Sequence, residues 1–145
     1  MPFASASKPD KVLVVKSERK LYLLRDGQVV GSYLVQLGRN PVGPKIFEGD
    51  GRTPEGLYVL DARNVGSRFY RSLHISYPNG DDHVRARAYG LSAGGLVMIH
   101  GQPNEPRSDH DAGQDWTEGC IAVSNNVMDA LWRTIDTGTP IEIIP

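Results

Sequence analysis

The chain has 145 residues, of which 39% are hydrophobic and 23% are charged, and its formal net charge is −1. This length suits one domain with a hydrophobic core, and no apolar stretch is long enough to span a membrane. The small net charge argues against a nucleic-acid partner, because domains that bind nucleic acids need a strong excess of basic residues. With a single cysteine the chain cannot form an internal disulfide, so disulfides give no indication of the compartment.

The N-terminal segment is expected to be a disordered tail over residues 1–10, followed by one domain over residues 11–145. Within the tail, Ala4-Ser5-Ala6 has the small-x-small form of a signal-peptidase site, although no charged and apolar signal regions precede it. We therefore interpret the tail as the remnant of a trimmed signal peptide, which favours a periplasmic or cell-envelope location. A cytoplasmic protein with an irregular start is the alternative.

The first half of the domain is predicted to be β structure. Short apolar runs rich in β-branched residues indicate strands, and Asp26-Gly27 favours a type I′ turn between two of them. Residues 38–53 hold four glycines and two prolines and are predicted to form a long loop, of the kind that often has a function. The strands expected in this half cover residues 11–16, 21–24, 29–37, 56–60 and 73–77.

A short helix and a buried strand are predicted next. The helix is expected to end at Arg87, with Asp81 or Asp82 as its N-cap and Gly90 closing it. The strand covers residues 96–100 and is apolar until its last residue, which indicates a central position in a sheet.

The C-terminal part begins with a polar loop over residues 102–115. The main helix is predicted over residues 126–136, with Ser124 or Asn125 as its N-cap and apolar residues at helical spacing. A closing strand covers residues 140–144. About seven or eight strands with one main helix predict a mostly β domain of compact barrel-like or sandwich form, because a parallel α/β sheet would need a helix between most strands.

The only cysteine, Cys120, follows a Thr-x-Gly turn, and His100 ends an apolar run upstream of it. The thiolate is the attacking form of cysteine, and an unassisted thiol of pKa ~8.5 is only a few per cent ionised at neutral pH. A neighbouring imidazole can act as the base, provided that it is close in space. We therefore interpret Cys120 as a nucleophile and expect His100 to lower its pKa and to serve as its base. The alternatives are a buried, inert cysteine and a structural histidine.

The segments Met98-Ile99-His100-Gly101 and Thr117-Glu118-Gly119-Cys120-Ile121 together resemble the L,D-transpeptidase (YkuD-type) catalytic domain family. Residues 51–58 are similar to the Thr-Pro-x-Gly entry to a central strand of that family. The resemblance covers roughly residues 11–144 and implies the compact, barrel-like β fold of the family.

The resemblance also implies roles for individual residues. Backbone N–H groups near Gly119 and Cys120 would form an oxyanion hole, and the carbonyl of Gly101 would orient the imidazole of His100. Thr117 is expected either to bond the turn or to touch substrate. The glycine before the cysteine would let the backbone approach a substrate without a side-chain clash.

The activity implied by the resemblance is acyl transfer on peptidoglycan stem peptides. The thiol would attack the amide after the L-centre of the third-position diamino acid, release the fourth residue and pass the acyl group to an acceptor amine. With water as acceptor, the same chemistry gives an L,D-carboxypeptidase or endopeptidase. A non-catalytic wall-binding domain is a further alternative. We expect no cofactor, and the resemblance implies acylation by carbapenem-type β-lactams. Nothing in the sequence indicates the oligomeric state.

Two positions beside the cysteine differ from the family pattern, because many members have His in place of Glu118 and Arg in place of Ala122. We expect Glu118 to point outward, since a carboxylate that faced the thiol would raise its pKa. There it would make the cleft mouth more negative and either hold a substrate ammonium or be solvated. Trp116 is either part of the core or a wall of the cleft. The arginines between Arg39 and Arg87 are interpreted as a mixed solvated surface. The alternative is that one or two of them meet substrate carboxylates, because a guanidinium fork suits that geometry.

A metal site is a competing interpretation of the histidines. The side chains that could in principle bind zinc are His74, His83, His100, His110 and Cys120. They show no close ligand pair, so we expect no zinc site. The acidic residues Asp109, Asp111 and Asp115 lack the calcium-loop pattern and are interpreted as a solvated loop.

Overall fold

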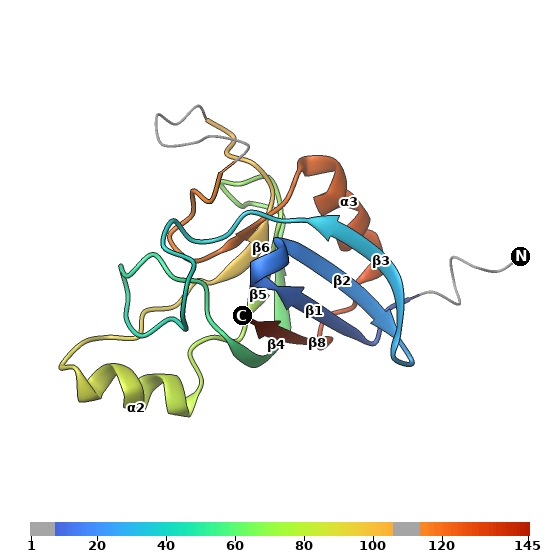
Figure 1. The fold of residues 1–145 in the computed structure, drawn as a ribbon. Coiled ribbons are helices and arrows are strands. Elements are labelled where there is room, and N and C mark those ends of the chain that lie inside the picture. Colours follow the sequence, from blue (N-terminus) through green and yellow to red (C-terminus); the bar gives the residue numbers. More distant parts are fainter. Residues whose placement is uncertain (1–7, 106–113) are drawn as a thin grey trace, which may run out of the picture.

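The computed structural model describes residues 8–105 and 114–145, and its main element is one curled sheet of eight strands (Figure 1). The strands are β1 (Lys11–Val15), β2 (Lys20–Arg25), β3 (Gln28–Leu34), β4 (Gly56–Asn64), β5 (Ser72–Ile75), β6 (Met98–His100), β7 (Ile121–Ala122) and β8 (Pro140–Ile144). The helices of the described residues are the 3-10 helix η1 (Lys16–Glu18), α2 (Gly80–Ala88) and α3 (Asn125–Thr134). The prediction of a mostly β domain is confirmed.

The strands follow the order β3-β2-β1-β8-β4-β5-β6-β7 across the sheet. The pairs β1–β8 and β6–β7 are parallel, and the other pairs are antiparallel. The two ends of the sheet meet where the chain leaves β3. There Gln36 and Ala122 exchange two backbone hydrogen bonds of 2.8 Å, and Gly38 forms a bridge with Thr117. These contacts give the sheet its barrel-like form and bring the segment after β3 to the segment around Cys120.

The core is built from alternate side chains of the strands and from one face of α3. In both β1 and β8 the central pattern alternates between buried and half-buried residues, as the period of two in a strand requires. On α3, Met128 and Leu131 are buried as predicted, and Val127 and Trp132 pack at the edge of the core. Ile135 is also buried, but it follows the last residue of the helix, which ends before the predicted Asp136. Full burial of a large aliphatic side chain stabilises the fold by ~2 kcal/mol, so this face fixes the helix against the sheet.

The helix N-caps agree with the sequence in one case and differ in the other. Ser124 caps α3, and its side-chain oxygen accepts the N–H of Val127. The N-cap of α2 is Asn79 rather than Asp81 or Asp82. The Asn79 side chain accepts the N–H of Asp82, and the Asp82 carboxylate accepts the N–H of Asn79, both at 2.9 Å. This reciprocal capping box starts the helix earlier than predicted.

Strand boundaries account for most of the remaining differences. The Asp26-Gly27 turn is confirmed, with φ values of 50° and 77°. β3 stops at Leu34, before the predicted end, because the chain then bends toward the other end of the sheet. β4 continues to Asn64 through exposed polar residues, because its backbone still pairs with β5. β7 was not predicted, since a strand of two residues is too short to show a period.

The N-terminal residues that the structure describes contact the body of the domain. The N–H of Asp10 donates to the carbonyl of Leu24 at 2.9 Å, and the Lys8 ammonium lies 2.9 Å from the Asp136 carboxylate. Residues 8–10 therefore do not form the expected tail. Residues 1–7, with the signal-peptidase-like triplet, lie outside the described residues. In the described part of the chain, no helix has the length and apolar character needed to cross a membrane.

Candidate active site

His100 is the last residue of β6, and its side chain is buried. Nδ1 of the ring lies 2.7 Å from the carbonyl oxygen of Gly101. Because a carbonyl oxygen can only accept, Nδ1 carries the proton of the neutral ring, and the lone pair is on Nε2. The ring stacks on Phe69 with a centroid distance of 4.4 Å and packs against Trp116 at 5.7 Å. One carbonyl and two aromatic rings therefore hold the imidazole in a fixed orientation.

Cys120 immediately precedes β7, which pairs in parallel with β6. The register places His100 opposite Ala122, so Cys120 is level with Met98. Alternate residues of a strand share one face of a sheet, so Cys120 and His100 face the same side as diagonal neighbours on adjacent strands. The parallel pairing thus brings together the two residues that the sequence singled out.

The Cys120 side chain is half-buried, and Sγ donates to the carbonyl of Leu96 at 3.4 Å. Burial raises the pKa of the thiol to about 11, while a hydrogen bond from the Met98 backbone and the positive charge of Lys45 act in the opposite direction. The lost hydration of the thiolate outweighs both favourable contacts. At neutral pH the resting residue is therefore a thiol, and attack requires a base. The expectation that His100 lowers the pKa of Cys120 stays a prediction.

Thr117 holds the turn that precedes the cysteine. Its buried hydroxyl donates to the carbonyl of Cys120 at 2.6 Å and accepts the N–H of Gly119 at 3.1 Å. A hydroxyl that bonds two backbone groups within one turn restricts the conformations of that turn. Thr117 was expected either to bond the turn or to touch substrate, and the structure shows that it bonds the turn.

Two glycines of the site are required by close contacts. Gly119 has a φ of +144°, and a Cβ there would lie 2.7 Å from the carbonyl oxygen of Arg52. At Gly101, a Cβ would lie 2.5 Å from Oδ1 of Asn125. The glycine before the cysteine is thus explained by a neighbouring loop of the protein, whereas the sequence suggested an approach to substrate.

Trp116 is buried, and its Nε1 donates to Oε1 of Gln36 at 2.8 Å. Its ring packs against Phe69 as well as His100, with centroid distances of 5.7 Å in both cases. The residue is therefore part of the core behind the imidazole. Phe69 lies in the connection between β4 and β5, and the sequence analysis missed it because no motif links that connection to the end of β6.

Glu118 points outward, as expected, with 68% of its side chain exposed, and its carboxylate lies 2.7 Å from Nε of Arg39. The positive charge of Arg39 therefore offsets the negative charge that Glu118 was expected to add at the cleft mouth. The arginine was interpreted as part of a solvated surface or as a contact for a substrate carboxylate, and its pairing with Glu118 was not predicted. An exposed ion pair of this kind contributes ~1 kcal/mol or less to stability.

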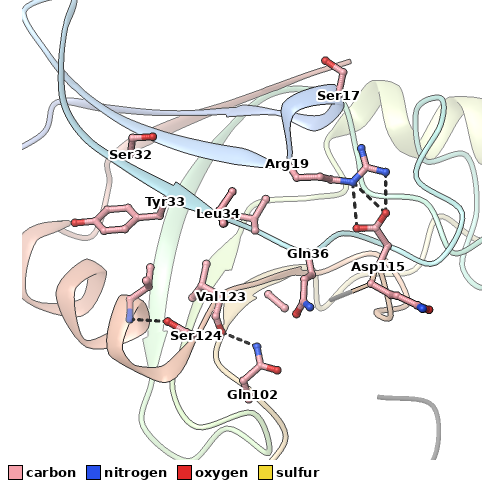
Figure 2. Close-up of a pocket in the computed structure, with 14 residues that line it drawn as sticks. Ser17, Arg19, Ser32, Tyr33, Leu34, Gln36, Gln102, Asp115, Val123 and Ser124 are labelled. Carbon is pink, nitrogen blue, oxygen red and sulfur yellow. Dashed lines mark hydrogen bonds and ion pairs between the residues drawn. The ribbon is translucent and has the colours of Figure 1, made fainter. Parts of the chain in front are cut away.

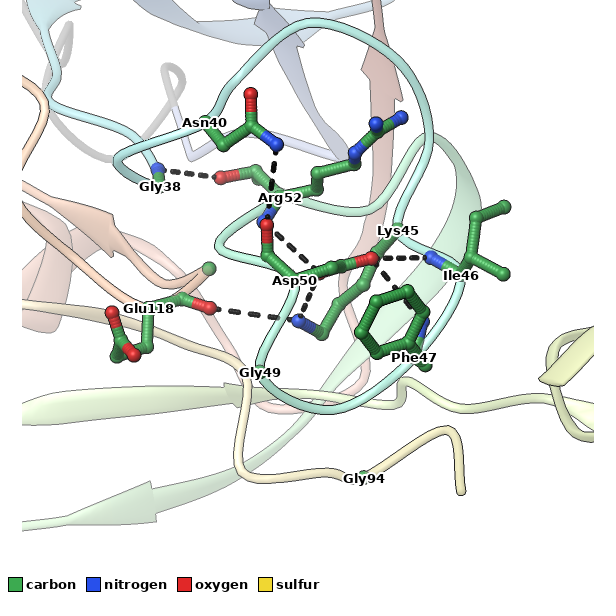
Figure 3. A network of polar contacts seen from close by, with 12 residues as sticks. Gly38, Asn40, Lys45, Ile46, Phe47, Gly49, Asp50, Arg52, Gly94 and Glu118 are labelled. Atoms are coloured by element: carbon green, nitrogen blue, oxygen red, sulfur yellow. Dashed lines mark hydrogen bonds and ion pairs between the residues drawn. The ribbon is translucent and has the colours of Figure 1, made fainter. Parts of the chain in front are cut away.

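The loop formed by residues 38–53 packs against the turn that carries Cys120 (Figure 3). The N–H of Arg39 donates to the carbonyl of Thr117 at 2.8 Å. Farther along the loop, Nζ of Lys45 lies 3.5 Å from the carbonyl oxygen of Glu118. The prediction that this loop has a function stays a prediction, but its position beside the candidate nucleophile is now defined.

The histidines that were considered as zinc ligands are separated. Nδ1 of His74 lies 2.6 Å from the carboxylate of Asp61, and His83 is exposed on α2. His100 is buried among aromatic rings, and His110 lies outside the described residues. Within residues 8–105 and 114–145, no group of three His, Cys, Asp or Glu side chains could hold a metal ion.

Asp115 forms specific contacts, which corrects the interpretation of a simply solvated residue. Its carboxylate lies 2.8 Å from the guanidinium of Arg19 (Figure 2). The same carboxylate accepts the N–H of Leu37 at 3.0 Å. This pair lines a pocket of about 1180 Å³ between the end of β3 and the start of α3, which the small side chain of Ala122 also lines. Asp109 and Asp111, the other members of the acidic cluster, are outside the described residues.

A family model of the L,D-transpeptidase catalytic domain (YkuD) matches residues 9–143. The chain therefore belongs to the family of L,D-transpeptidase catalytic domains. This match agrees with the curled, mostly β sheet and with the parallel β6–β7 pairing that brings the cysteine and the histidine together.

Known proteins similar to the chain carry the same family name or fold. "Putative L,D-transpeptidase YafK" of Escherichia coli is 29% identical over 133 residues, which are 88% of this chain and 47% of that protein. The helical cell shape determining protein Pgp2 of Campylobacter jejuni has a TM-score of 0.68 at 26% identity, covering 92% of this chain and 46% of Pgp2. LD transpeptidase LdtMt1 in complex with imipenem shares the fold, with a TM-score of 0.58 at 16% identity, over 92% of this chain and 58% of that one. The chain spans about half the length of YafK and Pgp2.

Proposed function

We propose that this protein is a cysteine-dependent acyltransferase that acts on peptidoglycan stem peptides. The observation that carries the proposal is the shared face of Cys120 and His100 on adjacent strands, with the Gly101 carbonyl fixing the imidazole tautomer. A neutral imidazole with its lone pair on Nε2 can accept a thiol proton. Such a base is needed because the thiol of Cys120 is protonated in the resting protein.

The proposed reaction has two half-reactions. In the first, Sγ of Cys120 attacks the carbonyl carbon of the third-position diamino acid while His100 accepts the thiol proton. The C–N bond to the fourth residue then breaks, His100 returns the proton to the leaving amine, and a thioester remains. In the second, an acceptor amine attacks the thioester and loses its proton to His100. The C–S bond breaks, and His100 gives the proton to the sulfur, which regenerates the thiol.

The backbone of the cysteine turn is the proposed oxyanion site. The N–H of Gly119 is already bonded to Thr117, so the N–H of Cys120 is the donor that we assign to the developing oxyanion. A donor fixed in advance at this position lowers the barrier by ~3 kcal/mol. Thr117 would contribute indirectly, by holding the turn.

The same chemistry extends to two further proposals. Carbapenem-type β-lactams are proposed to acylate Cys120, because a strained lactam carbonyl is an acyl donor; the imipenem complex of LdtMt1, which shares this fold, supports the proposal. Because cross-linked peptidoglycan lies outside the cytoplasmic membrane, we also propose that the protein acts in the periplasm or cell envelope.

Mass spectrometry of purified muropeptides incubated with the protein tests the proposed function. We expect cross-linked products joined through the third-position diamino acid, together with the released fourth residue. Trimmed tripeptides without cross-links would show that water is the acceptor, and thus an L,D-carboxypeptidase or endopeptidase. Unchanged muropeptides in the presence of folded protein would contradict acyl transfer and favour a wall-binding domain.

Glu118 is proposed to influence the choice of substrate or acceptor without taking part in bond breaking. We expect Glu118→Gln to change KM, or the ratio of transfer to hydrolysis, while the acylation rate at saturation stays within severalfold. The reason is that the exposed carboxylate of Glu118 is paired with Arg39, and an exposed charge changes an interaction free energy by ~1 kcal/mol or less. Steady-state kinetics with a stem tetrapeptide measure both quantities.

Arg39→Gln is the matched variant, because it removes the opposite charge of the same ion pair. If charge at the mouth selects the substrate, the two variants should shift KM for a charged peptide in opposite directions. A loss of acylation in Glu118→Gln as deep as that of a cysteine variant would place Glu118 in the catalytic machinery instead.

A further inference from the structure

Lys45 is a buried cation beside the turn of the candidate nucleophile. Only 5% of its side chain is exposed, and Nζ lies between two oxygens: Oδ1 of Asp50 at 2.9 Å and the carbonyl oxygen of Glu118 at 3.5 Å (Figure 3). A Cβ on Gly119 would lie 3.3 Å from the same nitrogen. The ammonium group therefore abuts the backbone of the two residues that precede Cys120.

Asp50 keeps this cation in place. Its Oδ2 accepts the N–H of Ile46 at 2.8 Å and of Phe47 at 3.2 Å, and its Oδ1 accepts the N–H of Arg52 at 3.0 Å. These backbone donors and the Lys45 ammonium hold the pKa of Asp50 below its ordinary value in spite of burial. A carboxylate bonded in this way stays ionised and can hold a lysine charge within the protein.

The contact with Glu118 completes a clamp on one peptide unit of the turn. Lys45 binds the carbonyl oxygen of the Glu118–Gly119 peptide, and Thr117 Oγ1 accepts its N–H at 3.1 Å. Both polar ends of this peptide are therefore held. Glycine at a φ of +144° allows the neighbouring backbone to rotate more freely than another residue would, so the clamp sets where the next N–H, that of Cys120, points.

Anchoring of the loop does not by itself explain a lysine at this position. Lys16 is a second buried lysine that holds the same loop, through the carbonyls of Gly43 at 3.0 Å and Thr53 at 2.7 Å and the carboxylate of Glu55 at 3.1 Å. The Lys16 ammonium contacts the loop and the residue before β4, whereas the Lys45 ammonium also contacts the cysteine turn.

We propose that Lys45 is a positioning residue of the acyl-transfer site, which places a fixed positive charge beside the sulfur of Cys120 and orients the backbone N–H of that residue. The inference rests on the proposed function of Cys120. The charge favours the thiolate as His100 removes the proton, and it offsets part of the effect of burial on the thiol pKa. Asp50 acts through Lys45 by keeping the ammonium in place.

The pH profile of Cys120 alkylation tests the proposal. Cys120 is the only cysteine, so iodoacetamide labelling of the intact chain reports on this thiol alone. Lys45→Gln removes the charge but keeps a donor for Asp50 and for the Glu118 carbonyl. We expect the pH profile of this variant to shift to higher pH. Near neutral pH, labelling should be three- to tenfold slower, because the thiol pKa rises by roughly one unit and the more nucleophilic thiolate offsets part of that effect. At alkaline pH the labelling rate should be undiminished.

Lys16→Gln is the matched control, because it also removes a buried lysine from the loop, and it should leave the profile unchanged. Lys45→Met is the second neutral variant, for use if the glutamine variant does not fold. An unchanged profile in the Lys45 variants, or an equal shift in Lys16→Gln, would overturn the proposal. Labelling needs no substrate, so these outcomes are independent of the muropeptide assay that tests the proposed function.

Discussion

Cys120→Ala is expected to abolish acyl transfer, with a loss in kcat on the order of 10⁴-fold or more. The sulfur is the atom that bonds the acyl group, and the methyl side chain of alanine cannot replace it. Because the side chain is small and half-buried, its truncation should lower stability by only ~1 kcal/mol. Product formation from a stem tetrapeptide and the Tm of the variant measure the two effects separately.

Cys120→Ser is a useful companion to the alanine variant. It preserves the shape of the side chain, and its hydroxyl is a much weaker acid than the thiol, so we expect it to be inactive as well. Near-normal turnover by the alanine variant would remove Cys120 from the mechanism. A variant that is inactive because it has unfolded would show a large fall in Tm, which the structure does not lead us to expect.

His100→Gln is expected to lower kcat by about 10²–10⁴-fold. A thiol with a pKa of about 11 is ionised to only roughly one part in 10⁴ near pH 7, so the reaction depends on a base to remove the proton. The fraction of thiolate rises with pH, reaches one half at that pKa and continues to rise above it. The deficit of the variant should therefore be largest at neutral pH and should shrink at alkaline pH, where hydroxide deprotonates the thiol. Alkylation of Cys120 as a function of pH measures this directly.

His74→Gln is the matched control for this experiment. His74 lies on β5 beside Asp61 and takes no part in the proposed reaction, so its substitution should leave the alkylation profile unchanged. Equal alkylation rates for the wild type and His100→Gln over the whole pH range would exclude His100 as the base.

Local patterns in the sequence were sufficient to predict most of the fold. The period of two in β1, the helical spacing in α3 and the positive-φ turn at Asp26-Gly27 each depend on residues that are close together in the chain. The candidate pair Cys120 and His100 was predictable for the same reason, since each belongs to a short motif.

Contacts between distant segments could not be predicted in this way. Phe69 stacks on the imidazole from the β4–β5 connection, and Arg39 neutralises Glu118 from the loop after β3. Closure of the curled sheet brings Arg39 to Glu118, and the pairing of β5 with β6 brings Phe69 to His100. No local period in the sequence records either contact. The increase in the pKa of Cys120 through burial could not be predicted either, because desolvation depends on everything that packs around the sulfur. A lysine in a loop likewise shows no sign, in the sequence, of being buried.

Between the two proposed half-reactions, the acyl group is expected to rest on the sulfur of Cys120, and peptide mapping after a rapid acid quench tests this most directly. The protein would be mixed with a stem tetrapeptide in the absence of an acceptor amine. We predict that the peptide containing Cys120 gains the mass of the tripeptide acyl group, that hydroxylamine removes it, and that Cys120→Ala shows no such adduct. Release of the fourth residue without an adduct on that peptide at any quench time would contradict covalent catalysis by Cys120.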